Sequence, residues 1–226
     1  MRPPVITLDG PAGSGKSTTA REVARRLGYR HLDSGALYRA LTFALLSAKI
    51  PKDEWVNLPR EALDRFPILL RPNGPRFDVL LGERVLEAEL RTPEVTALVS
   101  PLSALPAVRD WLLEAQREAG KEGGLVADGR DMGTVVFPDA EVKIFLTADL
   151  RERAARRFLE RESRQPSAGE LRLEAEKIEA RDKRDSSRAH APLRRASGAI
   201  EVDTSFLTFE DQVEVIIGHV KTLTKR

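Results

Sequence analysis

Short apolar runs alternate with segments of helical spacing from the beginning of the chain. Residues 5–9 (VITLD) are apolar and rich in β-branched side chains, and a glycine-rich turn separates them from residues 18–27, whose apolar positions recur at helical intervals. This order predicts a strand, a loop and a helix. Gly28 is typical of a helix end, residues 31–33 resemble a second short strand, and Ser34 is a candidate cap for a second helix.

Three later runs are short and rich in apolar residues, and they read as buried strands: residues 125–128, 142–146 and 200–203. Strands that are apolar on both faces and alternate with helical segments are typical of a parallel sheet covered by helices on both sides. We therefore expect an α/β protein with three layers and a central parallel sheet.

Two segments depart from this pattern. Residues 68–86 contain short strand-like runs broken by a Pro-Asn-Gly-Pro turn, which predicts antiparallel hairpins and hence a small β insertion. Residues 149–162 and the stretch from Glu170 onward are charged and helical in spacing, with a Gln-Pro-Ser-Ala-Gly break between them. We expect a helical hairpin at the surface that moves.

Composition narrows the class of protein. The 226 residues suit one compact body, and there is no cysteine, which excludes disulfides, thiolate metal sites and cysteine nucleophiles. A net charge of +2 is too balanced for a dedicated nucleic-acid binder. The sequence shows neither a long apolar run nor a signal-peptide pattern, so we expect a cytoplasmic protein without membrane association.

Residues 10–17 (GPAGSGKS) fit the pattern GxxxxGK[ST] between a predicted strand and a predicted helix. In such a P-loop the backbone N–H groups surround phosphate oxygens, Lys16 reaches the β and γ phosphates, and the Ser17 hydroxyl contacts Mg²⁺. The predicted ATP site comprises Gly10, Pro11, Ala12, Gly13, Ser14, Gly15, Lys16, Ser17 and Thr18.

A P-loop alone does not separate a kinase from a GTPase or a motor ATPase, so other residues must indicate an acceptor. Asp33 and Ser34 lie at the end of a predicted strand, and Arg39 follows about one helical turn further on, where it can hold an acceptor phosphate. A capping serine followed by a solvated arginine would give the same pattern. Asp128, Arg130 and Asp131 follow a buried strand, at the edge where open α/β sheets bind ligands.

Two arginine-rich helical segments supply further candidates. Arg181, Asp185 and Arg188 have the spacing of one helical face, and so do Arg153 and Arg157 in the preceding helix. Both patterns also occur on solvated helices, so spacing by itself leaves their role open.

Together, residues 10–18, 32–39, 128–134 and 181–188 closely resemble the bacterial cytidylate kinase family, and the resemblance runs nearly end to end. It implies that Arg39 and Arg130 contact the CMP phosphate. It also implies that Ser100, Arg109 and Asp131 read the cytosine edge, while Ser34, Arg181, Asp185 and Arg188 lie around the sugar. The opposite charges of Arg109 and Asp131 suit a base with both hydrogen-bond donors and acceptors.

The resulting hypothesis is an ATP-dependent nucleoside monophosphate kinase acting on CMP or dCMP as a monomer. We expect Lys16, Arg130, Arg153 and Arg157 to act catalytically. Mg²⁺ would be bound by Ser17 directly and by Asp33 or Asp128 through water. Other readings are a P-loop kinase for AMP, dTMP or shikimate, and a nucleotide-regulated module that contacts RNA.

The expected organisation is a single domain over 1–226. Its core would comprise 1–33, 90–148 and 189–226, with the acceptor-binding region and its β insertion at about 34–90 and the lid at about 149–188.

Overall fold

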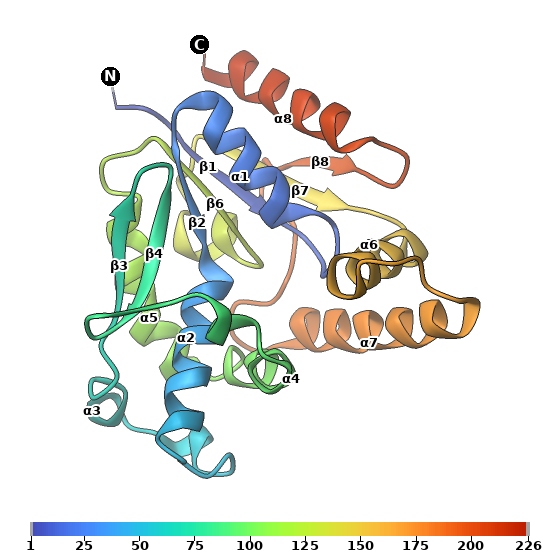
Figure 1. Ribbon diagram of the computed structural model, residues 1–226. Helices are drawn as coiled ribbons and strands as arrows, with labels where there is room; N and C mark the ends of the chain where they lie inside the picture. Colours follow the sequence, from blue (N-terminus) through green and yellow to red (C-terminus); the bar gives the residue numbers. More distant parts are fainter. Residues whose placement is uncertain (1, 225–226) are drawn as a thin grey trace.

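One central sheet organises the computed structural model, which describes residues 2–224 (Figure 1). Seven strands follow one another in the order β3-β4-β2-β6-β1-β7-β8, and an eighth, β5, pairs with β4. The strands are β1 (Val5–Asp9), β2 (Arg30–Asp33), β3 (Ile68–Asn73), β4 (Arg76–Leu81), β5 (Arg84–Leu86), β6 (Leu125–Gly129), β7 (Val142–Thr147) and β8 (Ile200–Asp203). The strands expected from the apolar runs are all present.

The five strands β2, β6, β1, β7 and β8 run parallel, as predicted. Their register places Asp9 beside Gly129, and Asp33 beside Asp128, at the carboxyl ends of β1, β2 and β6. Side chains from segments far apart in the sequence therefore meet at one edge of the sheet.

Helices cover the sheet on both faces and extend beyond its carboxyl edge. The longer helices are α1 (Lys16–Leu27), α2 (Ser34–Ser47), α4 (Pro93–Leu102), α5 (Pro106–Ala119), α6 (Leu150–Glu162), α7 (Ala168–Ser187) and α8 (Phe209–Thr224). The shorter ones are η1 (Trp55–Asn57), α3 (Arg60–Leu63), η2 (Ala88–Arg91) and the π-helical turn η3 (Met132–Val136). Among residues 2–224, no helix is both long and apolar enough to span a membrane.

The core has separate apolar clusters on the two faces of the sheet. On one face Ile6, Val126 and Ile144 pack with residues of α1 and α8, while on the other Val5 and Leu125 pack with η3 and α5. A third cluster joins α2, α3, α4 and α5 with the hairpin strands, and it supports the region between the sheet and α4. The three-layer arrangement expected from the sequence is confirmed.

The predicted β insertion is confirmed: β3, β4 and β5 pair antiparallel, and β4 also joins the main sheet through a parallel pairing of His31 with Arg76. One local prediction needs correction. Ser34 does not cap α2: the side chain of Asp33 accepts the hydrogen bond from the Ala36 amide, and Ser34 is the first helical residue. The Ser34 hydroxyl is instead free to donate to the Asp128 carbonyl oxygen, 2.8 Å away.

The predicted helical hairpin is formed by α6 and α7, which stand next to each other at the end of the sheet (Figure 1). Asp149 caps α6, and Ser167 with Glu170 forms a capping box that starts α7. Arg188 lies one residue beyond the end of α7, so it does not continue the helical face shared by Arg181 and Asp185.

Candidate functional site

The loop between β1 and α1 has the backbone geometry of a phosphate cradle. Gly13 and Gly15 have φ values of 76° and 84°, in the left-handed region that glycine adopts without strain. Gly10 also needs to be glycine, because an added Cβ would lie 2.1 Å from the Leu146 carbonyl oxygen. Helix α1 starts at Lys16, so its N-terminus faces the loop. Backbone N–H groups and the helix dipole together favour an anion here.

Lys16 is folded back onto this loop. Its ammonium group donates to the Pro11 carbonyl oxygen at 2.6 Å and to the Ser14 hydroxyl at 3.3 Å. Burial and the positive charge of Arg130 place the pKa of Lys16 well below its ordinary value. A phosphate in the cradle would stabilise the charged ammonium, since it would supply the opposite charge that this position lacks.

Two buried carboxylates, Asp33 and Asp128, lie at the ends of neighbouring strands. Burial opposes ionisation of Asp128, but the hydrogen bond from His31 at 2.7 Å and the Ser17 hydroxyl at 2.5 Å hold its pKa below the ordinary value. Burial and the Asp128 charge raise the pKa of Asp33. Asp128 is therefore the better anionic ligand of the two.

These residues fit a magnesium ion that is shared with phosphates. Within residues 2–224, no group of three or more acidic or imidazole side chains converges on one point as a protein-only metal site. Mg²⁺ typically takes one or two protein oxygens and completes its shell with water and substrate phosphate oxygens. The Ser17 hydroxyl and the Asp128 carboxylate, which already contact each other, supply such a pair.

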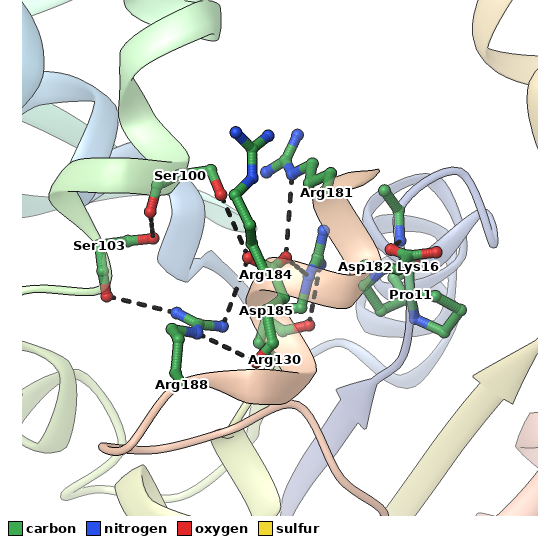
Figure 2. Close-up of polar contacts among 12 residues, drawn as sticks. Pro11, Lys16, Ser100, Ser103, Arg130, Arg181, Asp182, Arg184, Asp185 and Arg188 are labelled. Atoms are coloured by element: carbon green, nitrogen blue, oxygen red, sulfur yellow. Dashed lines mark hydrogen bonds and ion pairs between the residues drawn. The ribbon is translucent and has the colours of Figure 1, made fainter. Parts of the chain in front are cut away.

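On the opposite side of the pocket, arginines surround one buried carboxylate (Figure 2). The Nε of Arg130 donates to Asp185 at 2.9 Å, and Arg181 and Arg188 approach the same carboxylate at 3.8 and 3.7 Å. Burial disfavours the charged form of Asp185, yet the positive charge of Arg130, followed by the other two, holds its pKa below the ordinary value. The carboxylate thus organises a cluster whose positive charge exceeds its own.

This cluster retains hydrogen-bonding capacity. The Nε of Arg181 and one terminal nitrogen of Arg188 are buried without a hydrogen-bond partner. Burial and the charge of Arg130 lower the pKa of Arg181 to about 9, so the site is short of negative charge. Buried polar groups without partners are costly, and an anionic or polar ligand would supply the partners that these donors lack.

Arg109 and Asp131 form a second buried pair, and the Arg109 guanidinium lies over the Tyr38 ring, 5.5 Å from its centroid. Arg109 also donates to the Ser103 carbonyl oxygen at 2.9 Å. The aromatic ring and the two oxygen acceptors fix the guanidinium in one orientation. The pair presents hydrogen-bond donors and acceptors side by side, as recognition of a planar polar group requires.

The loop after β6 is held in place by the residue that precedes the P-loop. The Asp9 carboxylate accepts hydrogen bonds from the backbone amides of Met132 and Gly133 at 2.9 and 2.8 Å. Gly129 has no room for a side chain, because an added Cβ would lie 2.5 Å from the Ser34 hydroxyl oxygen. The P-loop, which follows β1, and the loop after β6 are therefore held next to each other at the carboxyl edge of the sheet.

Most of the predicted site residues line one continuous pocket. Those that do are Ala12, Gly13, Gly15, Lys16, Ser17, Thr18, Asp33, Ser34, Arg39, Arg109, Asp128, Arg130, Asp131, Arg157, Arg181, Asp185 and Arg188. Gly10, Pro11 and Ser14 belong to the loop but not to its lining. Ser100 stands behind the arginine cluster, where its hydroxyl donates to Asp185 at 3.3 Å.

Arg153 is the predicted catalytic residue that the structure places differently. Its guanidinium donates to the backbone oxygens of Ala148 and Ala12 at 3.0 and 2.9 Å, and it pairs with Asp182. Arg153 lines a separate hollow together with Asp182, whereas Arg157 lines the main pocket. Spacing suggested that the two arginines act together, but only Arg157 faces the pocket.

Several lining residues were missed by the sequence analysis: Arg21, Tyr38, Arg91, Val99, Ser103 and Glu160. His31, which contacts Asp128, was not among the predicted site residues either. The only signal for Tyr38 was its place next to Arg39, and Arg91 and Ser103 carry no local motif. Their membership in the site results from the chain path through α2, η2 and α4.

The site combines a phosphate cradle with a hydroxyl and a carboxylate suited to Mg²⁺, and an arginine-lined cavity faces them. This arrangement is that of a P-loop phosphotransferase for a small anionic acceptor. The family of the chain follows from comparison with known proteins. The sequence model of the cytidylate kinase family matches residues 6–222. The chain belongs to the cytidylate kinase family.

Individual relatives agree. The cytidylate kinase of Limosilactobacillus fermentum is 42% identical over 98% of this chain and 97% of its own length. That of Pseudomonas paraeruginosa is 48% identical over 96% of this chain and 94% of its own. The bifunctional pantoate ligase/cytidylate kinase of Synechococcus elongatus is 46% identical, but the match covers 42% of that longer protein.

Among solved structures, an uncharacterized protein from Eubacterium ventriosum superposes with a TM-score of 0.50 over 96% of this chain and 98% of its own, at 12% identity. This likeness concerns the fold alone.

Proposed function

We propose that this protein transfers the γ-phosphoryl group of ATP to CMP or dCMP, giving ADP and CDP or dCDP. The observation that carries the proposal is one pocket with a P-loop at one end and, at the other, Arg181 and Arg188, each with a buried nitrogen that makes no hydrogen bond. Membership of the cytidylate kinase family supports the same acceptor.

The reaction needs two anionic phosphates in line and neutralisation of charge on the transferring group. Lys16 would move from the Pro11 carbonyl to the β and γ phosphates of ATP. Arg39 and Arg130 would hold the acceptor phosphate, and Arg157 would stabilise the transferring group from the lid. Each of these side chains lines the pocket, and no covalent intermediate is required.

The acceptor base would be read by Arg109 and Asp131, supported by Ser100. Cytosine has an amino donor beside ring acceptors, and the paired carboxylate and guanidinium offer the complementary groups. Arg181, Asp185, Arg188 and Ser34 would surround the sugar. A uracil ring would present a carbonyl in place of the amino donor and leave Asp131 facing an acceptor.

When bound, Mg²⁺ would neutralise phosphate charge, and Ser17 with Asp128 would hold it. Asp128 takes this role in preference to Asp33, because His31 and Ser17 favour its ionised form. The Asp33 side chain already caps α2, which gives it a structural use.

We further propose the functional division of the chain. The core comprises 1–33, 90–148 and 189–226, the acceptor-binding region about 34–90, and the lid about 149–188. We also propose that the protein acts as a monomer in the cytoplasm, without nucleic-acid or membrane partners.

The test is ADP formation from ATP and Mg²⁺ with CMP, dCMP, UMP, AMP, GMP, dTMP or shikimate offered separately. CMP and dCMP should stimulate turnover most strongly. A leading purine nucleotide, dTMP or shikimate would contradict the acceptor assignment. Turnover that no acceptor stimulates would contradict the kinase function and leave the P-loop as a regulatory binding site.

A further inference from the structure

The lid hairpin holds the P-loop by its backbone at Ala12. The Ala12 amide donates to the Asp182 carboxylate at 2.9 Å, and the Ala12 carbonyl oxygen accepts from Arg153 at 2.9 Å. Arg153 comes from α6 and Asp182 from α7, and the two side chains also pair with each other. The lid therefore binds both the backbone N–H and the backbone carbonyl of Ala12. Figure 2 shows this region, with Asp182 beside Pro11 and Lys16.

Apolar packing reinforces this contact. The Ala12 side chain is 2% exposed and packs with Ala154 of α6 and Ile178 of α7. The next residue, Gly13, lies so close to α6 that an added Cβ would be 2.8 Å from the Arg153 carbonyl oxygen. The outer turn of the P-loop is therefore seated between the two lid helices.

The hydrogen-bonding geometry of Arg153 separates it from the arginines that face the pocket. Three of its contacts are made to the Ala148 carbonyl, the Ala12 carbonyl and Asp182. It does not line the pocket that contains Lys16 and Arg157. Among residues 2–224, it contacts the phosphate cradle through the backbone of the loop.

We propose that Arg153 and Asp182 are positioning residues that set the P-loop backbone for the donor phosphates and link lid position to donor affinity. Ala12 directly precedes Gly13, and Gly15 follows within the same loop. Glycine-rich backbone has high conformational freedom, so an unanchored loop must lose that freedom when a phosphate binds. The anchor removes this cost before binding. The inference rests on the proposed function in taking ATP as the donor.

The experiment measures equilibrium dissociation constants for a non-hydrolysable ATP analogue and for CMP, each bound alone to the full chain. Asp182→Ala should weaken analogue binding about tenfold, the effect of one charge-assisted hydrogen bond, and change CMP binding less than about twofold. Arg153→Ala should behave alike. Asp182→Asn should lose less, because its amide oxygen still accepts from Ala12. Glu179→Gln, an exposed change on the same helix, is the matched control and should change neither constant.

A double variant adds a second criterion. If the two side chains act as one anchor, Arg153→Ala with Asp182→Ala should weaken analogue binding no more than the worse single variant. Thermal unfolding of each variant establishes that the chain is folded. Unchanged analogue affinity in Asp182→Ala, or an equal loss for analogue and CMP, would overturn the proposal.

The outcomes also separate this inference from the proposed function. Wild-type protein that binds the analogue but not CMP would contradict the acceptor assignment, while a loss of analogue affinity in Asp182→Ala would still support the anchor. Wild-type protein that binds both nucleotides, with no selective loss in the variants, would contradict the anchor alone.

Discussion

Lys16 shows how a single side chain is prepared for an anion. It is 6% exposed, and its ammonium is satisfied by a backbone carbonyl and a serine hydroxyl of its own loop. Neither partner is charged, so a phosphate is a stronger ligand for it. The contacts that it makes without nucleotide keep the loop formed.

Lys16→Met should reduce turnover at least about a hundredfold, because in the proposed mechanism it removes the charge that would neutralise the transferring group. CMP affinity should change little, since the proposed acceptor contacts lie across the pocket. Steady-state kinetics with a separate CMP binding measurement tests both statements. Retained turnover would contradict the role of Lys16.

Asp9 makes stability depend on pH. It is 3% exposed, and burial raises its pKa from 3.8 to about 6 despite two backbone hydrogen bonds. A raised carboxyl pKa means that the folded state binds the proton more tightly. The associated stability is fully present below the unfolded pKa and is lost as pH rises through about 6.

The free energy of unfolding of wild type, relative to Asp9→Asn, should therefore increase as pH falls from about 7 to about 4, by on the order of 2 kcal/mol. Urea unfolding of both proteins at several pH values measures this difference. Asp139→Asn, at an exposed position, serves as the control. A difference between wild type and Asp9→Asn that does not vary with pH would contradict the raised pKa.

At the scale of elements, the hairpin of α6 and α7 is held together by a buried carboxylate. Glu174 of α7 is 2% exposed and binds Arg157 and Arg161 of α6, each at 3.0 Å. Arg157 was predicted to act in catalysis, and it lines the pocket. The bond from its Nε to Glu174 orients its guanidinium. The spacing of charges within each helix did not reveal this pairing between helices.

Glu174→Gln should lower kcat several-fold, by roughly the cost of a weakened buried ion pair, and leave the KM for CMP within about twofold. The amide keeps the shape but loses the charge that aligns Arg157. Glu176→Gln, an exposed change two residues away, should have no effect. An equal loss in both variants would indicate that the hairpin tolerates no change there.

At the scale of the whole molecule, α6 and α7 contact the core through the P-loop seat, the arginine cluster and the hydrogen bonds from Arg156 to Thr204. Closure over two bound nucleotides would add contacts between lid and core and exclude water from the reaction. The turn after α6 carries Arg164, whose side chain is 56% exposed, and is accessible to trypsin.

Cleavage in that turn should slow by about tenfold when the ATP analogue and CMP are both present, and less with either alone, because closure reduces local opening. The rate of fragment appearance on gels measures the effect. A rate that is the same with and without both nucleotides would contradict a moving lid.

The sequence alone determined the elements and the motif. Residues 10–17 form a phosphate cradle because glycine conformation, lysine position and helix start are local properties, and the parallel strands follow from apolar runs of limited length. The resemblance to a known family added which arginines to expect in the acceptor pocket. Where only local spacing was available, the geometry differed in two places: Arg153 contacts the P-loop backbone, and Asp33 rather than Ser34 caps α2.

Only the tertiary structure decided which of these residues meet. Asp9 binds amides 123 and 124 positions away, His31 orients Asp128, and Asp182 reaches Ala12 across 170 positions. These contacts depend on strand register and on how the lid helices pack, which no local pattern encodes. Helical spacing fixes which side chains share a face of a helix. The elements that pack against the helix decide what each side chain contacts: Arg157 lines the pocket, whereas Arg153 binds the P-loop backbone.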